Sequence, residues 1–176
     1  MLIYRKLLTH TRDQSILVKA SRYLFYYESI LDDEWQRMDF SKHLQSEGDL
    51  GIKMKKAFNH VLQIHSKAVI IGSDCPEISS EIIEDAFKKL DEFDCVIGPT
   101  TDGGYYLLGM KKFNPLLFEN IEWSTDKVFK QTQMKLNEAQ QNYSLLVTLT
   151  DVDTIDDLMK FPNLYEDLIN PPTNPI

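Results

Sequence analysis

The chain has 176 residues and a formal net charge of −8, with 43% hydrophobic and 26% charged residues. This composition is typical of a soluble globular protein, and one domain is the expectation at this length. The negative charge and the lack of a basic stripe argue against nucleic acid as a partner, and no apolar run approaches the roughly 20 residues of a membrane span.

The first half of the chain predicts two helices and two strands around a polar segment. A helix is expected from Leu2 to about Gln14, and the aromatic run Tyr23–Tyr27 predicts a strand. Residues 32–48 are polar and irregular. A second helix opens at Gly48–Gly51, and the continuous apolar run Ala68–Ile71 predicts a strand that is covered on both faces.

The following segment alternates between helix and strand. Ser79 or Ser80 is a suitable N-cap for a helix that carries acids in its first turn. Strands are expected at Cys95–Ile97 and Gly104–Met110. Ser124 can cap a helix over residues 125–140.

The last part of the chain predicts a strand at Leu145–Leu149 and a short final helix. Thr154 with Asp157 resembles a capping box for that helix. The proline-rich tail over residues 170–176 is expected to be flexible, which leaves residues 1–169 as one domain. The alternation of helices and strands predicts an α/β fold with a mostly parallel sheet and helices on both faces.

Three of the apolar runs end in carboxylates: Asp74, Asp102, and the pair Asp151 and Asp153. Ligands bind at the carboxyl ends of strands in open α/β sheets, and carboxylate oxygens suit hard divalent cations. In an extended segment Asp151 and Asp153 would point to the same side and could face Asp74. The alternatives are a turn aspartate that bonds its own backbone and a solvated acid pair before a helix.

The segment Asp102-Gly103-Gly104 predicts a tight turn, because paired glycines allow positive φ. It could form a backbone cradle for an acceptor or a sugar-phosphate, with Asp102 orienting a hydroxyl, or it could be a plain hairpin turn. One of Tyr105 and Tyr106 is expected to face the core and the other a cleft.

The segment Trp123–Thr125 is expected at a helix start, where an acceptor carboxylate or phosphate could bind. The alternative is an ordinary cap with Trp123 as a packing anchor. Cys75 and Cys95 are expected to be buried free thiols, which fits a reducing cytoplasm. The four histidines belong to no nucleophile motif and are expected on surfaces or helices: His10, His43, His60 and His65.

In their order and spacing, five segments together resemble a known bacterial family: Glu47–Gly51, Gly72–Pro76, Gly98–Tyr106, Trp123–Thr125 and Asp151–Thr154. The family comprises uncharacterised glycosyltransferase-like proteins of the radical-SAM/selenodomain-associated transferase type. They are related to 2-phospholactate guanylyltransferase and, more distantly, to molybdenum-cofactor guanylyltransferases. The resemblance implies a three-layer αβα nucleotide-diphospho-sugar transferase fold (GT-A, Rossmann-like) with a mixed, mostly parallel sheet.

The resemblance also implies roles for individual residues. Asp74, Asp151 and Asp153 would bind Mg²⁺ or Mn²⁺, and Asp102 would be catalytic. The partners would be a nucleotide or nucleotide-sugar donor and a small acceptor. The substrate-binding residues expected are Ser73, Pro76, Gly103, Gly104, Tyr105, Trp123 and Ser124.

Members of the family usually begin with a strand and a glycine-containing basic loop that embraces the nucleotide phosphates. This chain resembles them from the following helix onward, so the first strand and the phosphate loop are expected to be missing. A metal-dependent nucleotidyltransferase or glycosyltransferase is the first hypothesis, and a non-catalytic or regulatory relic of the fold is the second. A third is a structural partner that forms a homodimer through the strand edges left unpaired.

Overall fold

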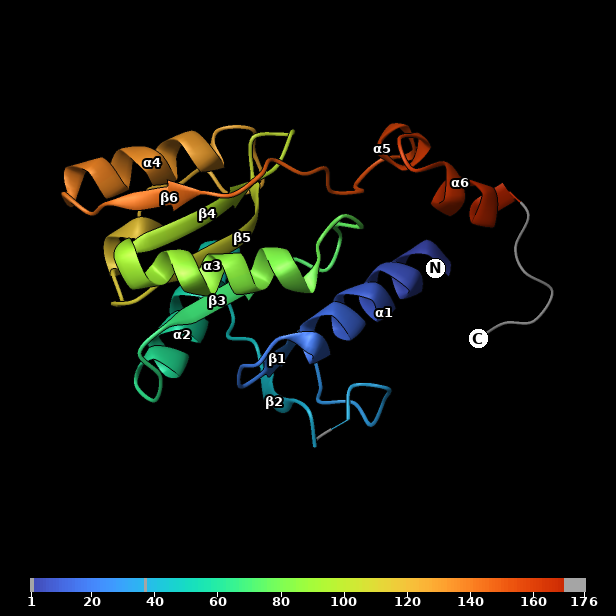
Figure 1. The fold of residues 1–176 in the computed structure, drawn as a ribbon, viewed down its shortest axis with the longest axis horizontal. Coiled ribbons are helices and arrows are strands. Elements are labelled where there is room, and N and C mark those ends of the chain that lie inside the picture. Colours follow the sequence, from blue (N-terminus) through green and yellow to red (C-terminus); the bar gives the residue numbers. More distant parts are fainter. Residues whose placement is uncertain (1, 37, 170–176) are drawn as a thin grey trace.

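The computed structural model describes residues 2–36 and 38–169 as an ordered series of helices and short strands (Figure 1). In chain order the elements are α1 (Leu2–Leu17), β1 (Tyr23–Tyr26), β2 (Ser41–Leu44), α2 (Leu50–Leu62), β3 (Ala68–Ile71), α3 (Ser80–Glu92), β4 (Cys95–Pro99), β5 (Tyr105–Met110), the 3₁₀ helix η1 (Pro115–Phe118), α4 (Val128–Glu138), β6 (Tyr143–Leu145), α5 (Ile155–Met159) and α6 (Pro162–Ile169).

The strands form a four-stranded sheet in the order β3-β5-β4-β6 and a separate parallel pair, β1-β2. Within the larger sheet β5 runs antiparallel to both of its neighbours, while β4 and β6 are parallel. Three of the four strands therefore share one direction, which confirms the mixed, mostly parallel α/β fold expected from the sequence.

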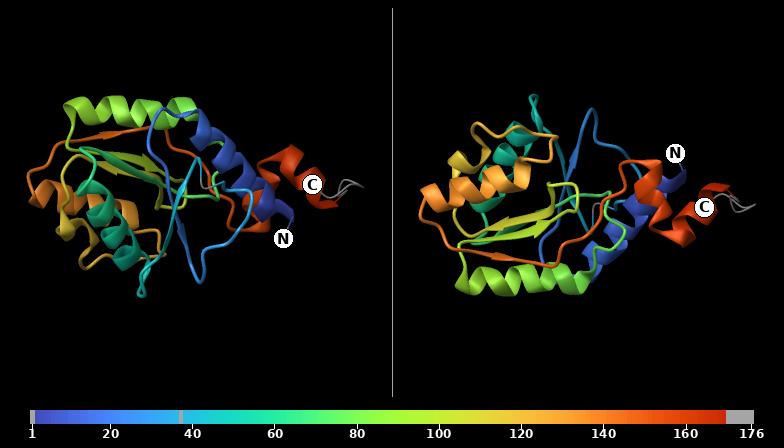
Figure 2. Two further views of the ribbon diagram at one scale, coloured as in Figure 1. Left: turned by 90° about the horizontal axis from the view of Figure 1, so that it is seen from below. Right: turned by 90° about the horizontal axis from the view of Figure 1, so that it is seen from above.

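Helices cover both faces of the four-stranded sheet, with α3 on one face and α2 and α4 on the other (Figure 2). Along β4, Val96 packs into the buried cluster that contains Leu90 of α3. Its neighbour Ile97 packs into the opposite cluster with Phe58 of α2 and Leu136 of α4. The period-2 alternation of strand side chains thus supplies both layers of the core.

Side-chain caps fix the starts of three helices. Asp49 accepts a hydrogen bond from the N–H of Ile52 at 2.8 Å, and Ser79, rather than Ser80, caps α3. Thr154 and Asp157 form the predicted capping box at the start of α5. These caps satisfy backbone N–H groups that have no partner within the helix.

Several element predictions were wrong in place or extent. The strand β2 lies within the segment predicted to be irregular, and β6 covers Tyr143–Leu145 instead of 145–149. The helix predicted from residue 125 begins at Val128, and its N-cap, Lys127, makes no side-chain capping bond. Ser124 is therefore not a helix cap; it lies in a turn with a left-handed φ of 61°. The predicted flexible tail over residues 170–176 lies outside the described residues.

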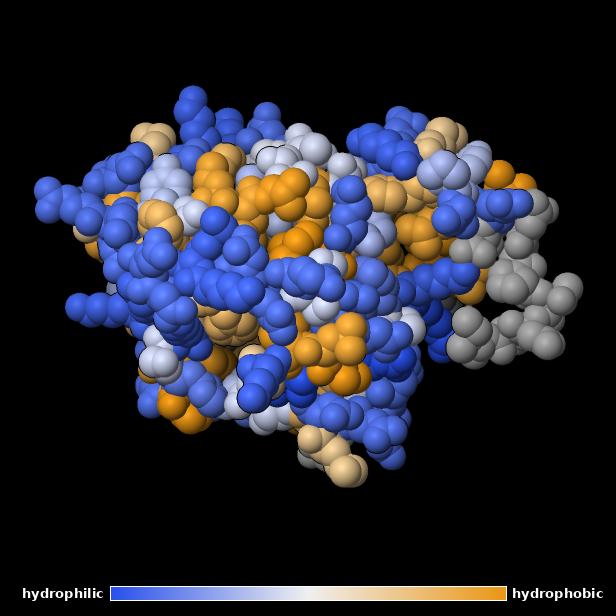
Figure 3. Space-filling view, in the orientation of Figure 1, coloured by the Kyte–Doolittle hydropathy of each residue, from blue (hydrophilic) through white to orange (hydrophobic). Residues whose placement is uncertain are grey.

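The surface seen in Figure 3 is mostly hydrophilic, with hydrophobic side chains between the charged ones. Leu145 and Val147, in and just after the edge strand β6, are exposed. Across the described part of the chain, no helix combines the length and the apolar character needed to cross a membrane.

Candidate functional site

Three chain segments meet at the carboxyl ends of β3 and β4. We call them the acidic rim: residues 72–78, 100–104 and 149–153. Thr100 and Leu149 form a parallel bridge, and the N–H of Thr101 donates to the carbonyl of Leu149 at 3.0 Å. The N–H of Val152 donates to the carbonyl of Asp74 at 2.9 Å. Backbone hydrogen bonds therefore hold the three segments in register.

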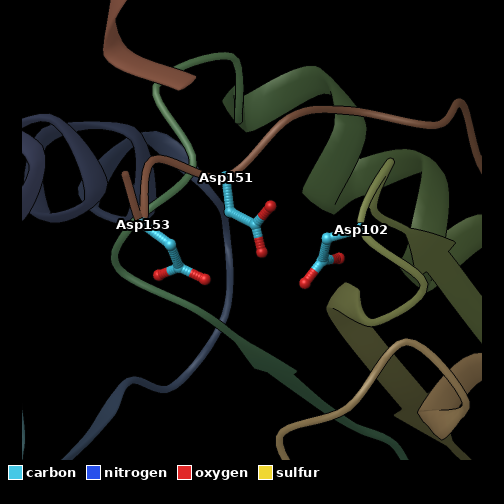
Figure 4. Close-up of side chains that lie close together, drawn as sticks. All are labelled: Asp102, Asp151 and Asp153. Carbon is cyan, nitrogen blue, oxygen red and sulfur yellow. The ribbon is translucent and has the colours of Figure 1, made fainter. Parts of the chain in front are cut away.

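Three carboxylates of the acidic rim converge (Figure 4). Asp102, Asp151 and Asp153 each offer a carboxylate oxygen, and these oxygens lie within 4.8 Å of one another. None of the three has an ion-pair partner within residues 2–36 and 38–169. Uncompensated oxygens at this spacing fit a hard divalent cation such as Mg²⁺ or Mn²⁺.

Asp74 lies beside this group but is not one of its three members. Its carboxylate turns back toward Gly72, where a Cβ atom would lie 2.7 Å from Asp74 Oδ1. Burial raises the pKa of Asp74, and the negative charges of Asp153 and Asp102 raise it further. The structure thus places Asp74 near Asp153, a member of the pair predicted to face it, and also near Asp102.

The pKa of Asp151 shows how tightly the charges are grouped. Burial raises this pKa to about 6, and the charges of Asp102, Asp74 and Asp153 add to the rise. Repulsion between like charges favours the neutral acid in this way. A bound cation would offset the repulsion that adds to the effect of burial.

Asp102 joins the group because its turn fixes its side chain. The Thr100 hydroxyl and the N–H of Gly104 (2.9 Å) both donate to Asp102 Oδ1. The sequence indicated the turn and singled out Asp102, but it missed Thr100 as the residue that orients the carboxylate. A threonine two residues before a turn aspartate is the only signal that could have suggested it.

The backbone at Gly103 favours glycine, so replacing this residue tests how much the turn contributes to stability. Gly103 has φ +95°, and an added Cβ would lie 2.2 Å from the carbonyl oxygen of Asp126. We expect Gly103→Ala to lower the free energy of unfolding by about 2 kcal/mol or more, as measured by urea denaturation. In Gly104→Ala the new Cβ would meet only side-chain atoms, at 3.0 Å or more, so a smaller loss is expected. Equal losses of stability in the two variants would show that Gly103 has no special need for glycine.

A cavity of about 1220 Å³ opens beside the acidic rim and reaches into the molecule. Of the predicted substrate-binding residues, Ser73, Gly104, Tyr105, Trp123 and Ser124 line it. Pro76 and Gly103 are not in its wall. Gly103 packs against Asp126 instead.

The two neighbouring tyrosines do not divide between core and cleft as expected. Tyr106 is buried, and its hydroxyl donates to the carbonyl of Val147 at 3.1 Å. Burial also encloses the Tyr105 hydroxyl, which has no hydrogen-bond partner within the described residues. Both rings border the cavity wall, but neither hydroxyl is presented to a ligand.

Trp123 reaches the cavity wall through a close contact with α2. An added Cβ on Gly51 would lie 2.1 Å from the indole nitrogen of Trp123, so the ring rests directly on the helix backbone. The sequence indicated both segments as parts of motifs but did not predict that they touch.

Two strands with an open edge border the same cavity. The structure pairs β1 only with β2 and β3 only with β5 among the residues it describes, and all residues of β1 and β3 line the cavity. Three cations also line it, but each contacts other groups. Arg22 bonds carbonyls at the end of α1, Lys67 pairs with Asp91, and the Lys53 ammonium lies 4.6 Å from the ring centroid of Tyr27.

Both cysteines are buried free thiols, as predicted. Burial raises the pKa of Cys75 to about 11 and that of Cys95 to about 12. At neutral pH neither thiol is a nucleophile or a metal ligand.

Comparison with known proteins agrees with the fold. The sequence model of a family described as uncharacterised proteins conserved in bacteria (DUF2064) matches residues 12–125. A 2-phospho-L-lactate guanylyltransferase from Methanocaldococcus vulcanius is 28% identical over 131 residues, which are 74% of this chain and 58% of that protein. A second, from Methanocaldococcus sp. (strain FS406-22), is 29% identical over 105 residues, or 60% of this chain and 45% of that protein. The chain thus spans about half the length of these curated relatives.

Solved structures show the same architecture. A protein from Desulfovibrio desulfuricans G20, provisionally classed as a nucleotide-diphospho-sugar transferase, superposes with a TM-score of 0.84 at 27% identity, over 95% of this chain and 80% of that one. The CMP:2-keto-3-deoxy-manno-octonic acid synthetase complexed with CTP superposes with a TM-score of 0.62 at 11% identity, over 92% of this chain and 88% of that one. The second likeness concerns the fold alone.

Proposed function

Because the chain belongs to the DUF2064 family and has the nucleotide-diphospho-sugar transferase fold, we propose that it is a metal-dependent transferase that uses a nucleotide-activated donor. The convergence of Asp102, Asp151 and Asp153 carries this proposal, because three uncompensated carboxylates suit a divalent ion that carries donor phosphates. Between nucleotidyl and glycosyl transfer, the two guanylyltransferases among its relatives favour nucleotidyl transfer.

Asp102, Asp151 and Asp153 would hold Mg²⁺ or Mn²⁺, with Asp74 beside them. When bound, the ion would neutralise charge on the donor phosphates and position them for in-line displacement. Asp102, held by Thr100 and Gly104, would orient the attacking acceptor group. No covalent intermediate on the protein is required by this arrangement.

The donor would occupy the large cavity next to the acidic rim, in contact with Ser73, Gly104 and the Trp123–Ser124 turn. Residues 1–169 would act as one domain. The buried free thiols of Cys75 and Cys95 support a reducing, cytoplasmic location.

One observation favours a second candidate function, that of a non-catalytic binding protein with the same fold. The cations in the cavity wall already contact carbonyls, a carboxylate or an aromatic ring, so no basic group of the described residues is directed at donor phosphates. Such a protein would bind a nucleotide weakly and transfer nothing.

Titration calorimetry with GTP, CTP, ATP, UTP and nucleotide sugars, each with and without Mg²⁺ or Mn²⁺, tests the proposal. We expect binding of at least one donor to depend on the metal. Asp153→Asn is expected to lose that binding, whereas the exposed Asp156→Asn, three residues away, should retain it. Metal-dependent binding without product release from any acceptor would favour the non-catalytic candidate. Equal binding in both variants would refute the metal site.

A further inference from the structure

A second hollow, whose wall is basic where the rim is acidic, lies between α2 and β2. It encloses about 270 Å³, and we call it the basic pocket after the charged and polar side chains in its wall, which are His43, Ser46, Lys53, Lys56 and His60. No carboxylate lines it among the described residues, although the whole chain carries a net charge of −8.

The helical repeat explains why these side chains gather. Lys53, Lys56 and His60 stand at positions i, i+3 and i+7 of α2, so they share one face of the helix. His43 comes from β2, and its ring centroid lies 4.9 Å from that of His60. Lys55, on a different face, instead pairs with Glu119 at 2.8 Å.

The pocket also has polar groups without partners. The Ser46 hydroxyl is buried and makes no hydrogen bond within the described residues. The exposed Lys56 has no carboxylate partner there either. Burial lowers the pKa of His43, and the neighbouring His60 lowers it further, so the imidazole of His43 is less readily charged than a free one. An oxyanion would accept hydrogen bonds from the hydroxyl and the ammonium groups together.

We propose that the basic pocket binds the phosphate group of a small anionic ligand. A tetrahedral phosphate accepts several charge-assisted hydrogen bonds at once, as this donor set requires. The hollow is much larger than the roughly 30 Å³ of one water molecule, so it has room for a phosphate with a small substituent. The basic pocket shares Lys53 with the large cavity, but none of its residues belongs to the acidic rim, so phosphate binding here does not depend on the proposed metal site.

Histidine ring NMR signals provide the readout, with inorganic phosphate as the probe. The titration is run at constant ionic strength with a chelator present, so that no divalent ion can recruit phosphate to the acidic rim. We expect saturable shifts of the His43 and His60 signals. Removal of one charge-assisted contact in Lys56→Gln should weaken binding about tenfold, and Ser46→Ala should weaken it less.

Two control variants separate the possible outcomes. Lys55→Gln removes the same charge from the same helix outside the pocket, and Asp151→Asn disables the acidic rim, so both should bind phosphate like the parent. The absence of saturable shifts, or equal weakening in Lys55→Gln and Lys56→Gln, would overturn the proposal.

Discussion

Asp151→Asn is expected to abolish metal-dependent donor binding, by about 100-fold or more, and yet to make the metal-free protein more stable above pH 6. Asparagine keeps the shape of the side chain but removes the charge that a divalent ion needs. It also removes a partly buried charge; burial, together with repulsion from the neighbouring acids, raises the pKa of Asp151 to about 6. Calorimetry with Mg²⁺ and nucleotide measures the first effect, and urea denaturation without metal measures the second.

The gain in stability of Asp151→Asn depends on pH, because the pKa of Asp151 is raised in the folded protein. An aspartate in the unfolded chain has a pKa near 3.9, so the folded state binds the proton more tightly. In the metal-free parent the contribution of Asp151 to stability is therefore fully present below about pH 4 and is lost as the pH rises through about 6. At pH 8 the variant should be more stable by about 1–2 kcal/mol, after allowance for solvent screening of a partly exposed group. At pH 4 the two proteins should be equal.

Asp156→Asn is the matched control, because Asp156 is exposed at the start of α5 and outside the carboxylate group. It should change neither metal-dependent binding nor the pH profile. If Asp151→Asn destabilised the metal-free protein at pH 8, the carboxylates would not repel one another as described.

A strand joined ahead of Leu2 is the second change with a large expected effect. An eight-residue segment rich in valine and isoleucine, followed by a short glycine-containing loop, should enter the large cavity and pair with the open edges of β1 and β3. Apolar burial and new backbone hydrogen bonds would outweigh the cost of ordering the segment by a few kcal/mol, which corresponds to a rise in Tm of about 5–10 °C.

Amide hydrogen exchange locates the effect. The amides of β1 and β3 should gain protection, while those of β6 at the opposite edge of the sheet should not. A glycine-serine extension of the same length is the control and should change neither property. A rise in Tm without added protection in β1 and β3 would mean that the segment binds elsewhere.

The sequence predicted best those features that depend on local patterns. The strands at the apolar runs β3 and β4 and the capping box at Thr154 are confirmed, because apolar runs and cap geometry leave direct signatures, although β3 is only partly buried. The strand β2 was missed, since Ser-Lys-His-Leu has neither an apolar run nor β-branched residues. Its extended form depends on pairing with β1, which local propensity does not reveal.

The candidate site was predictable in outline but not in detail. Acids at the ends of separate strands indicated a common edge, and the structure brings them there. The grouping of Asp102 with Asp151 and Asp153 depends on the bond from Thr100 and on the bridge between Thr100 and Leu149. Ser124 was misread as a helix cap, because a serine before a polar segment looks the same whether its φ is negative or, as here, 61°.

The two enclosed sulfur atoms give the molecule a built-in reporter. Cys75 directly follows Asp74 at the acidic rim, whereas Cys95 begins a central strand. A thiol-reactive dye would therefore label the first position on local opening of the rim and the second only on global unfolding. The ratio of the two labelling rates, followed by mass spectrometry, would then distinguish loosening at the substrate edge from loss of the whole fold.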